Sequence, residues 1–213
     1  MIEWTMFGSL IGLVFVASIT PGPNNFMLMS SGALFGFKRS LPHILGVTLG
    51  FPALLIATVY GLGAIIERLP WLVTIVKTIG AAWLAWMAIK FFIEAKRIAL
   101  AKNNTGISAK PTSRARPFRF YEAALFQWAN PKAVIMALTT SGAFVPLSPN
   151  IHMRALLITS VFIVFALLAT SVWTLAGSTL NRAMSQGRSA VVLNIVMGVL
   201  LLGTAAVIFM TPT

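Results

Sequence analysis

The chain of 213 residues contains no cysteine and no aspartate, and its acidic residues are four glutamates. Without cysteine it can form no disulfide, thiol relay or thiolate metal site. Its two histidines, His43 and His152, lie far apart in the sequence. No nucleophile–base constellation, haem-ligating histidine pair or hard metal-ligand cluster is recognisable. We therefore expect neither an enzyme nor a redox relay, and no cofactor and no metal.

Charged residues make up only 9% of the chain, whereas hydrophobic residues make up 58%. A helix that crosses the hydrocarbon core of a bilayer needs about 20 apolar residues. The sequence predicts an all-α membrane protein with six spans, at about 6–34, 41–66, 70–95, 119–145, 152–178 and 188–210. Little chain remains for an extramembrane domain, so we expect one transmembrane domain, 1–213.

The net charge of +12 is distributed unevenly among the connections between these spans. Those after the second and fourth spans carry only Arg68 and Arg154. Those after the first, third and fifth carry Lys38, Arg39, Lys96, Arg97, Lys102, Lys110, Arg114, Arg116, Arg119, Arg182 and Arg188. Basic loops stay in the cytoplasm, which predicts that both termini lie outside. A basic patch for RNA or anionic lipid explains the alternation less well, so we expect membrane lipid as a partner and no nucleic acid.

Two polar breaks interrupt the expected first and fourth spans near their middles. They are Thr20-Pro21-Gly22-Pro23-Asn24-Asn25 and Asn130-Pro131-Lys132, and an offset of 110 residues relates Pro21 to Pro131. The same offset places Ser31-Gly32-Ala33 on Ser141-Gly142-Ala143. Irregular backbone at membrane depth is tolerated where it is buried in protein or lines a cavity. Broken helices at corresponding positions of two halves indicate the binding site of a transporter.

A polar stretch at about 98–118 separates two halves of three expected spans each. An odd number of spans per half makes the second half enter the membrane from the opposite side. We therefore expect two inverted three-helix repeats, about 1–97 and 119–213, joined by a cytoplasmic loop, with helices 1 and 4 broken at proline. Chance similarity within a sequence rich in small residues is the alternative.

The prolines remove backbone hydrogen bonds at both breaks. Proline lacks an amide hydrogen and its ring collides with the carbonyl four residues earlier, which frees the carbonyls of Ala17, Ile19 and Gln127. Water or neighbouring side chains could donate hydrogen bonds to these carbonyls at a simple kink. We favour the alternative, in which they form a substrate site. The predicted substrate-binding residues are Ala17, Ile19, Thr20, Pro21, Gly22, Pro23, Asn24, Asn25, Gln127, Asn130, Pro131 and Lys132.

Lys132 is the most informative single residue, because a charge at the bilayer centre costs roughly 2.5–3.5 kcal/mol on insertion scales. Glu122 precedes it by ten residues, about 15 Å along an ideal helix, and the other glutamates lie at the ends of other spans. Without an internal counter-ion, Lys132 suits a substrate carboxylate, while the substrate ammonium would meet carbonyls and amides. A second hypothesis makes Lys132 the proton-coupling group, through loss and gain of its proton.

Glycines recur at four-residue spacing in Gly8 with Gly12, Gly32 with Gly36, and Gly46 with Gly50. Such pairs let membrane helices approach closely. Packing within one chain is the preferred interpretation, and a homodimer is the alternative.

Several motifs resemble the LysE/RhtB family of amino-acid exporters. They are Ala17-Ser18-Ile19-Thr20-Pro21-Gly22-Pro23-Asn24-Asn25, Gly36-Phe37-Lys38-Arg39-Ser40, Gln127-Trp128-Ala129-Asn130-Pro131-Lys132, Trp173-Thr174-Leu175-Ala176-Gly177 and Leu193-Asn194-Ile195-Val196. The resemblance implies a secondary carrier of the bacterial inner membrane, an antiporter that exports amino acids at the expense of the proton-motive force. The last two segments most resemble the cysteine/O-acetylserine exporter branch.

The absence of aspartate offers little to a dibasic substrate, so we favour small neutral amino acids such as threonine, homoserine, cysteine or O-acetylserine. Export of basic amino acids and a passive channel or facilitator for a small polar solute are the alternatives.

Overall fold

A computed structural model describes residues 1–20, 22–62, 65, 68–69, 71–105, 116–184 and 188–210. Its regular structure within these ranges is entirely helical, which confirms the predicted all-α class. The helices are α1 (Trp4–Ile19), α2 (Pro23–Phe35), α3 (Leu41–Ala57), α5 (Trp71–Thr105), α6 (Phe120–Ala129), α7 (Pro131–Ala143), α8 (Ile151–Met184) and α9 (Arg188–Met210). Short helical turns at Lys38–Ser40, Thr58–Leu62 and Val145–Leu147 join some of them.

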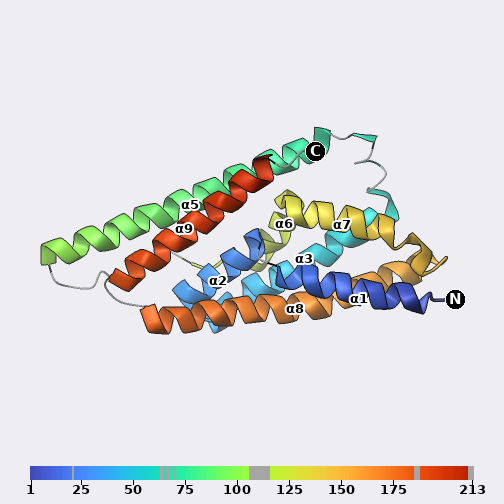
Figure 1. Cartoon of the computed structure of the whole chain (residues 1–213), viewed down its shortest axis with the longest axis horizontal. Coiled ribbons are helices and arrows are strands. Elements are labelled where there is room, and N and C mark those ends of the chain that lie inside the picture. The colour runs from blue at the N-terminus through green and yellow to red at the C-terminus, as the bar shows by residue number, and fades with distance from the viewer. Residues whose placement is uncertain are drawn as a thin grey trace.

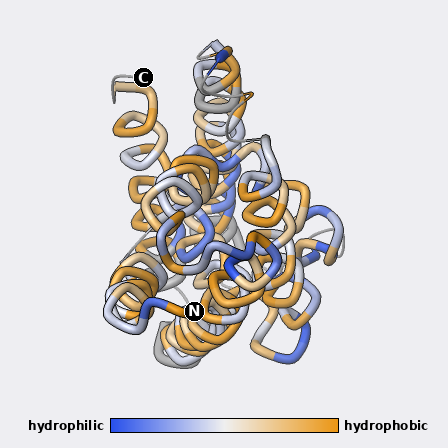
Figure 2. Tube along the Cα trace, turned by 90° about the vertical axis from the view of Figure 1, so that its right-hand side faces the viewer, coloured by the Kyte–Doolittle hydropathy of each residue, from blue (hydrophilic) through white to orange (hydrophobic). Residues whose placement is uncertain are grey.

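The helices lie roughly along one long axis in two groups (Figure 1). One group contains α1, α2, α3, α6, α7 and α8, and the second is the pair α5 and α9, which pack along each other. The helix α9 runs toward the end of the molecule that carries the N terminus (Figure 1). Hydrophobic residues predominate along the helical trace, with shorter hydrophilic stretches between them (Figure 2).

Three of the described helical stretches are long and apolar enough to cross a membrane, namely Lys38–Gly61, Thr78–Leu100 and Ile151–Leu180. The pair α1 and α2 would add a fourth if its two members form one span. The C-terminal stretch Asn194–Met210 is apolar but shorter. Six spans and an inverted repeat therefore stay predictions.

Both helices that were expected to break do so at the predicted places. Helix α1 ends at Ile19 and α2 begins at Pro23, with a bend of 51° between them. Helix α6 ends at Ala129, Asn130 is extended, and α7 begins at Pro131. Pro23 and Pro131 each occupy the first position of a new helix, where the missing amide hydrogen costs nothing.

Helix α5, which corresponds to the third expected span, is longer than the sequence predicted. The polar loop was expected from about 98, but α5 continues to Thr105. The reason is local, since Ala, Leu, Lys and Arg, all strong helix formers, fill much of the segment after Glu94. Residues 106–115 of the expected loop lie outside the described residues.

Glycines bring α2 and α8 into backbone contact. A Cβ at Gly32 would overlap the carbonyl of Thr174, and a Cβ at Gly177 would overlap the carbonyl of Met29. Gly46 and Gly50 likewise let α3 touch α6. Gly8 and Gly12 have nothing within 4 Å of an added Cβ. Three of the predicted small-residue positions thus pack within the chain, and they fix the broken helices against α3 and α8.

This packing gives a stability prediction. Gly177→Ala should lower the free energy of unfolding by about 1–3 kcal/mol, because overpacking forces two backbones apart. The measurement is thermal unfolding of the detergent-solubilised protein. Gly203→Ala is the matched control, since Gly203 has open space around it and should lose no stability. Equal unfolding temperatures for the two variants would contradict the close contact.

Candidate functional site

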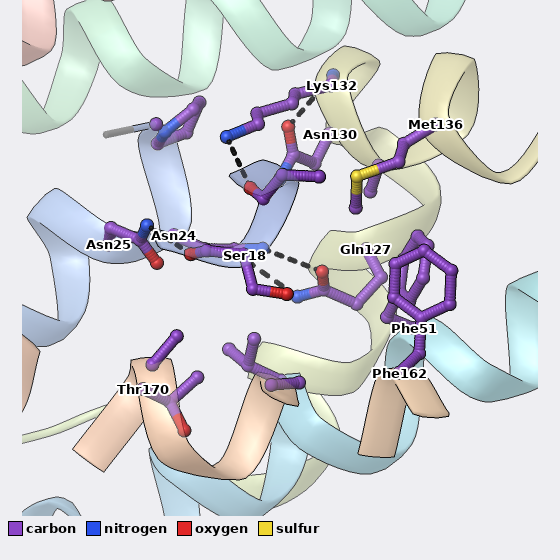
Figure 3. A pocket seen from close by; sticks show the side chains of 17 residues that line it. Ser18, Asn24, Asn25, Phe51, Gln127, Asn130, Lys132, Met136, Phe162 and Thr170 are labelled. Carbon is purple, nitrogen blue, oxygen red and sulfur yellow. Dashed lines mark hydrogen bonds between the residues drawn. The ribbon is translucent and has the colours of Figure 1, made fainter. Parts of the chain in front are cut away.

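A cavity of about 70 Å³ lies where the two breaks meet (Figure 3). Its polar lining comes from both breaks, and α3 and α8 complete the wall with Phe51, Phe162 and Thr170. A buried water needs about 10–15 Å³ of such volume, so the space holds a few waters. It is smaller than an ordinary ligand pocket of about 300–1,000 Å³. The cavity is thus a narrow one in this conformation.

Lys132, which is half-buried, reaches from the start of α7 to the end of α1. Its Nζ donates hydrogen bonds to the carbonyl oxygens of Ala17, at 3.2 Å, and Thr20, at 2.9 Å. Gly22 makes room for this side chain, since a Cβ there would stand 2.9 Å from Lys132 Cδ and 3.2 Å from Nζ. Lys132 therefore acts as a cationic cap on the carbonyl end of α1, the negative end of the helix dipole.

Asn25 binds the same end of α1 from the other side of the break. Its Nδ2 donates to the carbonyls of Ser18, at 3.1 Å, and Thr20, at 3.0 Å, and the residue is 8% exposed. The carbonyl of Thr20 thus accepts from both Asn25 and Lys132. Of the carbonyls that the prolines were expected to free, that of Ala17 therefore accepts from a side chain, and that of Gln127 accepts from the backbone amide of Asn130 at 3.4 Å. Groups of the protein thus satisfy these two carbonyls, an outcome left open in the sequence analysis.

A pair of amides joins the two breaks directly. Asn24 Nδ2 donates to Gln127 Oε1 at 2.7 Å, and Gln127 Nε2 donates back to Asn24 Oδ1 at 3.3 Å. Figure 3 shows the two side chains joined by hydrogen bonds at the edge of the cavity. Gln127 is fully buried and also donates to the carbonyl of Ala123 at 2.8 Å. This pair fixes α2 against α6.

The two half-helices that begin at the breaks differ at their N-terminal ends. In α7 the Oδ1 of Asn130 accepts from the backbone amide of Lys132 at 3.2 Å. In α2 the residue before the helix is Gly22, so no side chain caps the first amides. An uncapped N-terminal end favours an anion, and here it adjoins the cavity.

None of the described residues that line the cavity carries a carboxylate. In the described part of the chain the ion pairs are Arg97 with Glu94 and Arg116 with Glu122. Glu122 accepts two hydrogen bonds from the Arg116 guanidinium, at 2.7 Å and 2.5 Å, and this bonding raises the pKa of Arg116 above its ordinary value. Glu122 is thus committed at the start of α6 and does not pair with Lys132.

Most of the predicted site residues come together. Ala17, Gly22, Pro23, Asn24, Asn25, Gln127, Asn130 and Lys132 line the cavity. Thr20 adds its carbonyl. Ile19 and Pro131 do not line the cavity: Ile19 is 49% exposed, and Pro131 packs against Gly80 of α5. Pro21 lies outside the described residues.

Sequence reasoning missed the walls of the cavity. Ser18 also lines the cavity, and its position between the predicted residues Ala17 and Ile19 could have identified it. The others are Val47, Phe51, Ala133, Met136, Phe162, Ala166 and Ala169. These are ordinary residues of apolar helices, and only the packing of α3, α7 and α8 against the breaks selects them. No group of three potential metal ligands occurs among the described side chains.

The amide pair predicts energetic coupling between the breaks. Asn24→Ala and Gln127→Ala should each destabilise the protein by about 1–3 kcal/mol, because each removes the hydrogen-bond partner of a buried or half-buried amide. The double variant should lose less than the sum, with a coupling of about 0.5–3 kcal/mol. Chemical unfolding in detergent measures the cycle, and additive losses would contradict the contact.

The sequence is similar to a family of known transport proteins. The family model of the LysE type translocator matches residues 15–211. A cysteine/O-acetylserine efflux protein of Escherichia coli (strain K12) is 29% identical over 211 residues, which cover 96% of this chain and 98% of the relative. Its counterpart in Salmonella typhimurium (strain LT2) is 29% identical over 201 residues, covering 91% and 92%. No solved structure matches the chain.

The matched region includes both breaks and every described residue that lines the cavity. The family resemblance seen in the sequence motifs is thereby confirmed. The relatives are transporters and not enzymes. The chain belongs to the LysE type translocator family.

Proposed function

We propose that the protein is a secondary transporter that exports small neutral amino acids or close derivatives from the cytoplasm. The observation that carries this proposal is the cavity between the two broken helices, which combines backbone carbonyls, amides and one lysine without any acidic side chain. The names of the relatives support cysteine and O-acetylserine as the first substrates to test. Threonine and homoserine are further candidates of the same size and charge.

The break in the first span offers opposite ends of two helices to a zwitterion. The carbonyl end of α1 favours the substrate ammonium, and the uncapped amide end of α2 favours the carboxylate. A second cationic group on the substrate would find no carboxylate in the lining. This charge balance is the reason to prefer neutral over basic amino acids.

We place the protein in the bacterial inner membrane with six spans, in two inverted repeats, and with both termini outside. Support comes from the corresponding breaks of α1–α2 and α6–α7 and from the alternating basic connections. Alternating access would then move one repeat against the other around a site near the midplane. A homodimer is compatible with the open surface at Gly8 and Gly12, but packing within the chain accounts for Gly32, Gly46 and Gly50.

Transport assays in everted membrane vesicles test the export function. Vesicles containing the protein should accumulate O-acetyl-L-serine or L-cysteine several-fold when a proton gradient is applied, and an uncoupler should abolish the accumulation. L-lysine serves as the dibasic comparison and should not accumulate. Equilibration without accumulation would indicate a passive facilitator, and no uptake of any of the neutral candidates would refute amino-acid export.

Lys132 is the proposed proton-coupling residue, because it is the one ionisable side chain among the described residues that line the cavity. In the same vesicles Lys132→Gln should abolish proton-driven accumulation while the variant remains in the membrane. Lys90→Gln is the matched control, since Lys90 lies over the Trp86 ring on α5, away from the cavity. Full accumulation by Lys132→Gln would remove this residue from the coupling mechanism.

A further inference from the structure

The ammonium of Lys132 has the same chemistry as the amino group of the proposed substrate. Both are primary ammonium groups with three hydrogen-bond donors and one positive charge. In the structure the Lys132 ammonium binds the carbonyls of Ala17 and Thr20 at 3.2 Å and 2.9 Å. These carbonyls belong to the end of α1, the group of acceptors that the proposed function assigns to a substrate ammonium.

A lysine and a substrate ammonium cannot share these acceptors. Two like charges a few ångströms apart repel each other, and the space that remains beside Lys132 is only about 70 Å³. The Thr20 carbonyl already accepts from Asn25 as well, so its capacity is filled. Binding of a zwitterion therefore requires that the Lys132 side chain leave.

We propose that Lys132 is a tethered competitor of the substrate. Its ammonium occupies the substrate ammonium subsite at Ala17 and Thr20 when the transporter is empty, and the amino group of the substrate displaces it. This inference rests on the proposed function and revises one part of the sequence analysis, in which Lys132 was expected to bind the substrate carboxylate. The carboxylate instead meets the uncapped start of α2.

The surroundings of Lys132 suit a side chain that leaves and returns. Its four-carbon stem is flexible, and Gly22 has no Cβ to hold it in place. The elements around it present polar but non-titrating groups to the cavity, among them Ser18, Asn24 and Thr170. The ammonium is therefore held by hydrogen bonds to neutral groups and not by an ion pair, so a second ammonium can replace it.

Other charged and titratable groups on the packed elements, among the described side chains, do not line the cavity. On α3 the buried His43 stacks on Phe118, and on α5 Lys90 lies over Trp86. On α8 His152 contacts Tyr60, and Arg154 donates to the carbonyls of Val145 and Ser148. The side chain of Lys77 on α5 lies outside the described side chains.

Displacement supplies a simple route to proton coupling. The displaced ammonium loses its two carbonyl acceptors, one N–H bond breaks, and a water molecule takes the proton on the cytoplasmic side. After the substrate has left on the outer side, the neutral amine takes a proton from water there and binds the carbonyls again. One proton thus enters for each zwitterion exported, with Lys132 and the substrate alternating at one subsite.

The decisive measurement is equilibrium binding of O-acetyl-L-serine and L-cysteine to the purified protein in detergent. If Lys132 holds the subsite for about nine-tenths of the time, Lys132→Met should tighten binding roughly tenfold, because the competent state is no longer a minor one. Lys90→Met is the control for loss of one cation and should bind like the wild type. Thermal unfolding verifies that each variant is folded.

The opposite result separates this inference from the proposed function. If the wild type binds and Lys132→Met binds ten times more weakly or not at all, Lys132 contacts the carboxylate and the competitor role is wrong, although export stands. Unchanged affinity would also overturn it. If the wild type binds and transports neither probe, the proposed function fails, and the inference fails with it.

A second variant, Lys132→Ala, tests the same proposal without a methionine side chain in the subsite. Lys132→Ala empties the subsite, so propylammonium, which resembles the lost side chain, should compete with O-acetyl-L-serine in this variant. In the wild type the tethered amine already fills the subsite, and the same concentration of propylammonium should have at least tenfold less effect. Equal inhibition of both proteins would overturn the proposal.

Discussion

The structure depends on how carbonyl groups at the end of α1 are satisfied. Proline and glycine end the helix in the middle of an apolar stretch, where an unpaired carbonyl would cost several kcal/mol. Side chains from two distant parts of the chain donate hydrogen bonds to these carbonyls. They are Asn25 from the following half-helix and Lys132 from the break in the other half. One backbone defect therefore joins the two halves and creates a polar site between them.

The remaining packing holds this site in place. Glycine contacts press α2 against α8 and α3 against α6 so closely that backbones touch, while the Asn24 and Gln127 amides connect α2 to α6. The pair α5 and α9 packs mainly on itself (Figure 1). The broken helices are thus embedded in the larger helix group, and a motion of either half would change the geometry around Lys132.

Much of the fold and of the site followed from local chemistry. Apolar length predicted the helices, prolines predicted the two interruptions, and the lack of a nearby acid singled out Lys132. Predictions of which groups bind each other across the two breaks were less successful. The carbonyl of Ile19 was expected in the site, yet the side chains in this conformation bind Ala17, Ser18 and Thr20, because the direction of each carbonyl depends on the bend between α1 and α2.

The sequence by itself determined the class of protein, the places where helices break and the residue types that meet there, because these follow from hydrophobicity and from the geometry of proline. Only the tertiary structure decided what Lys132 binds and which apolar residues wall the cavity. The reason is physical: a flexible four-carbon ammonium takes the nearest acceptors that packing offers, and those acceptors lie 112 and 115 residues away in the chain.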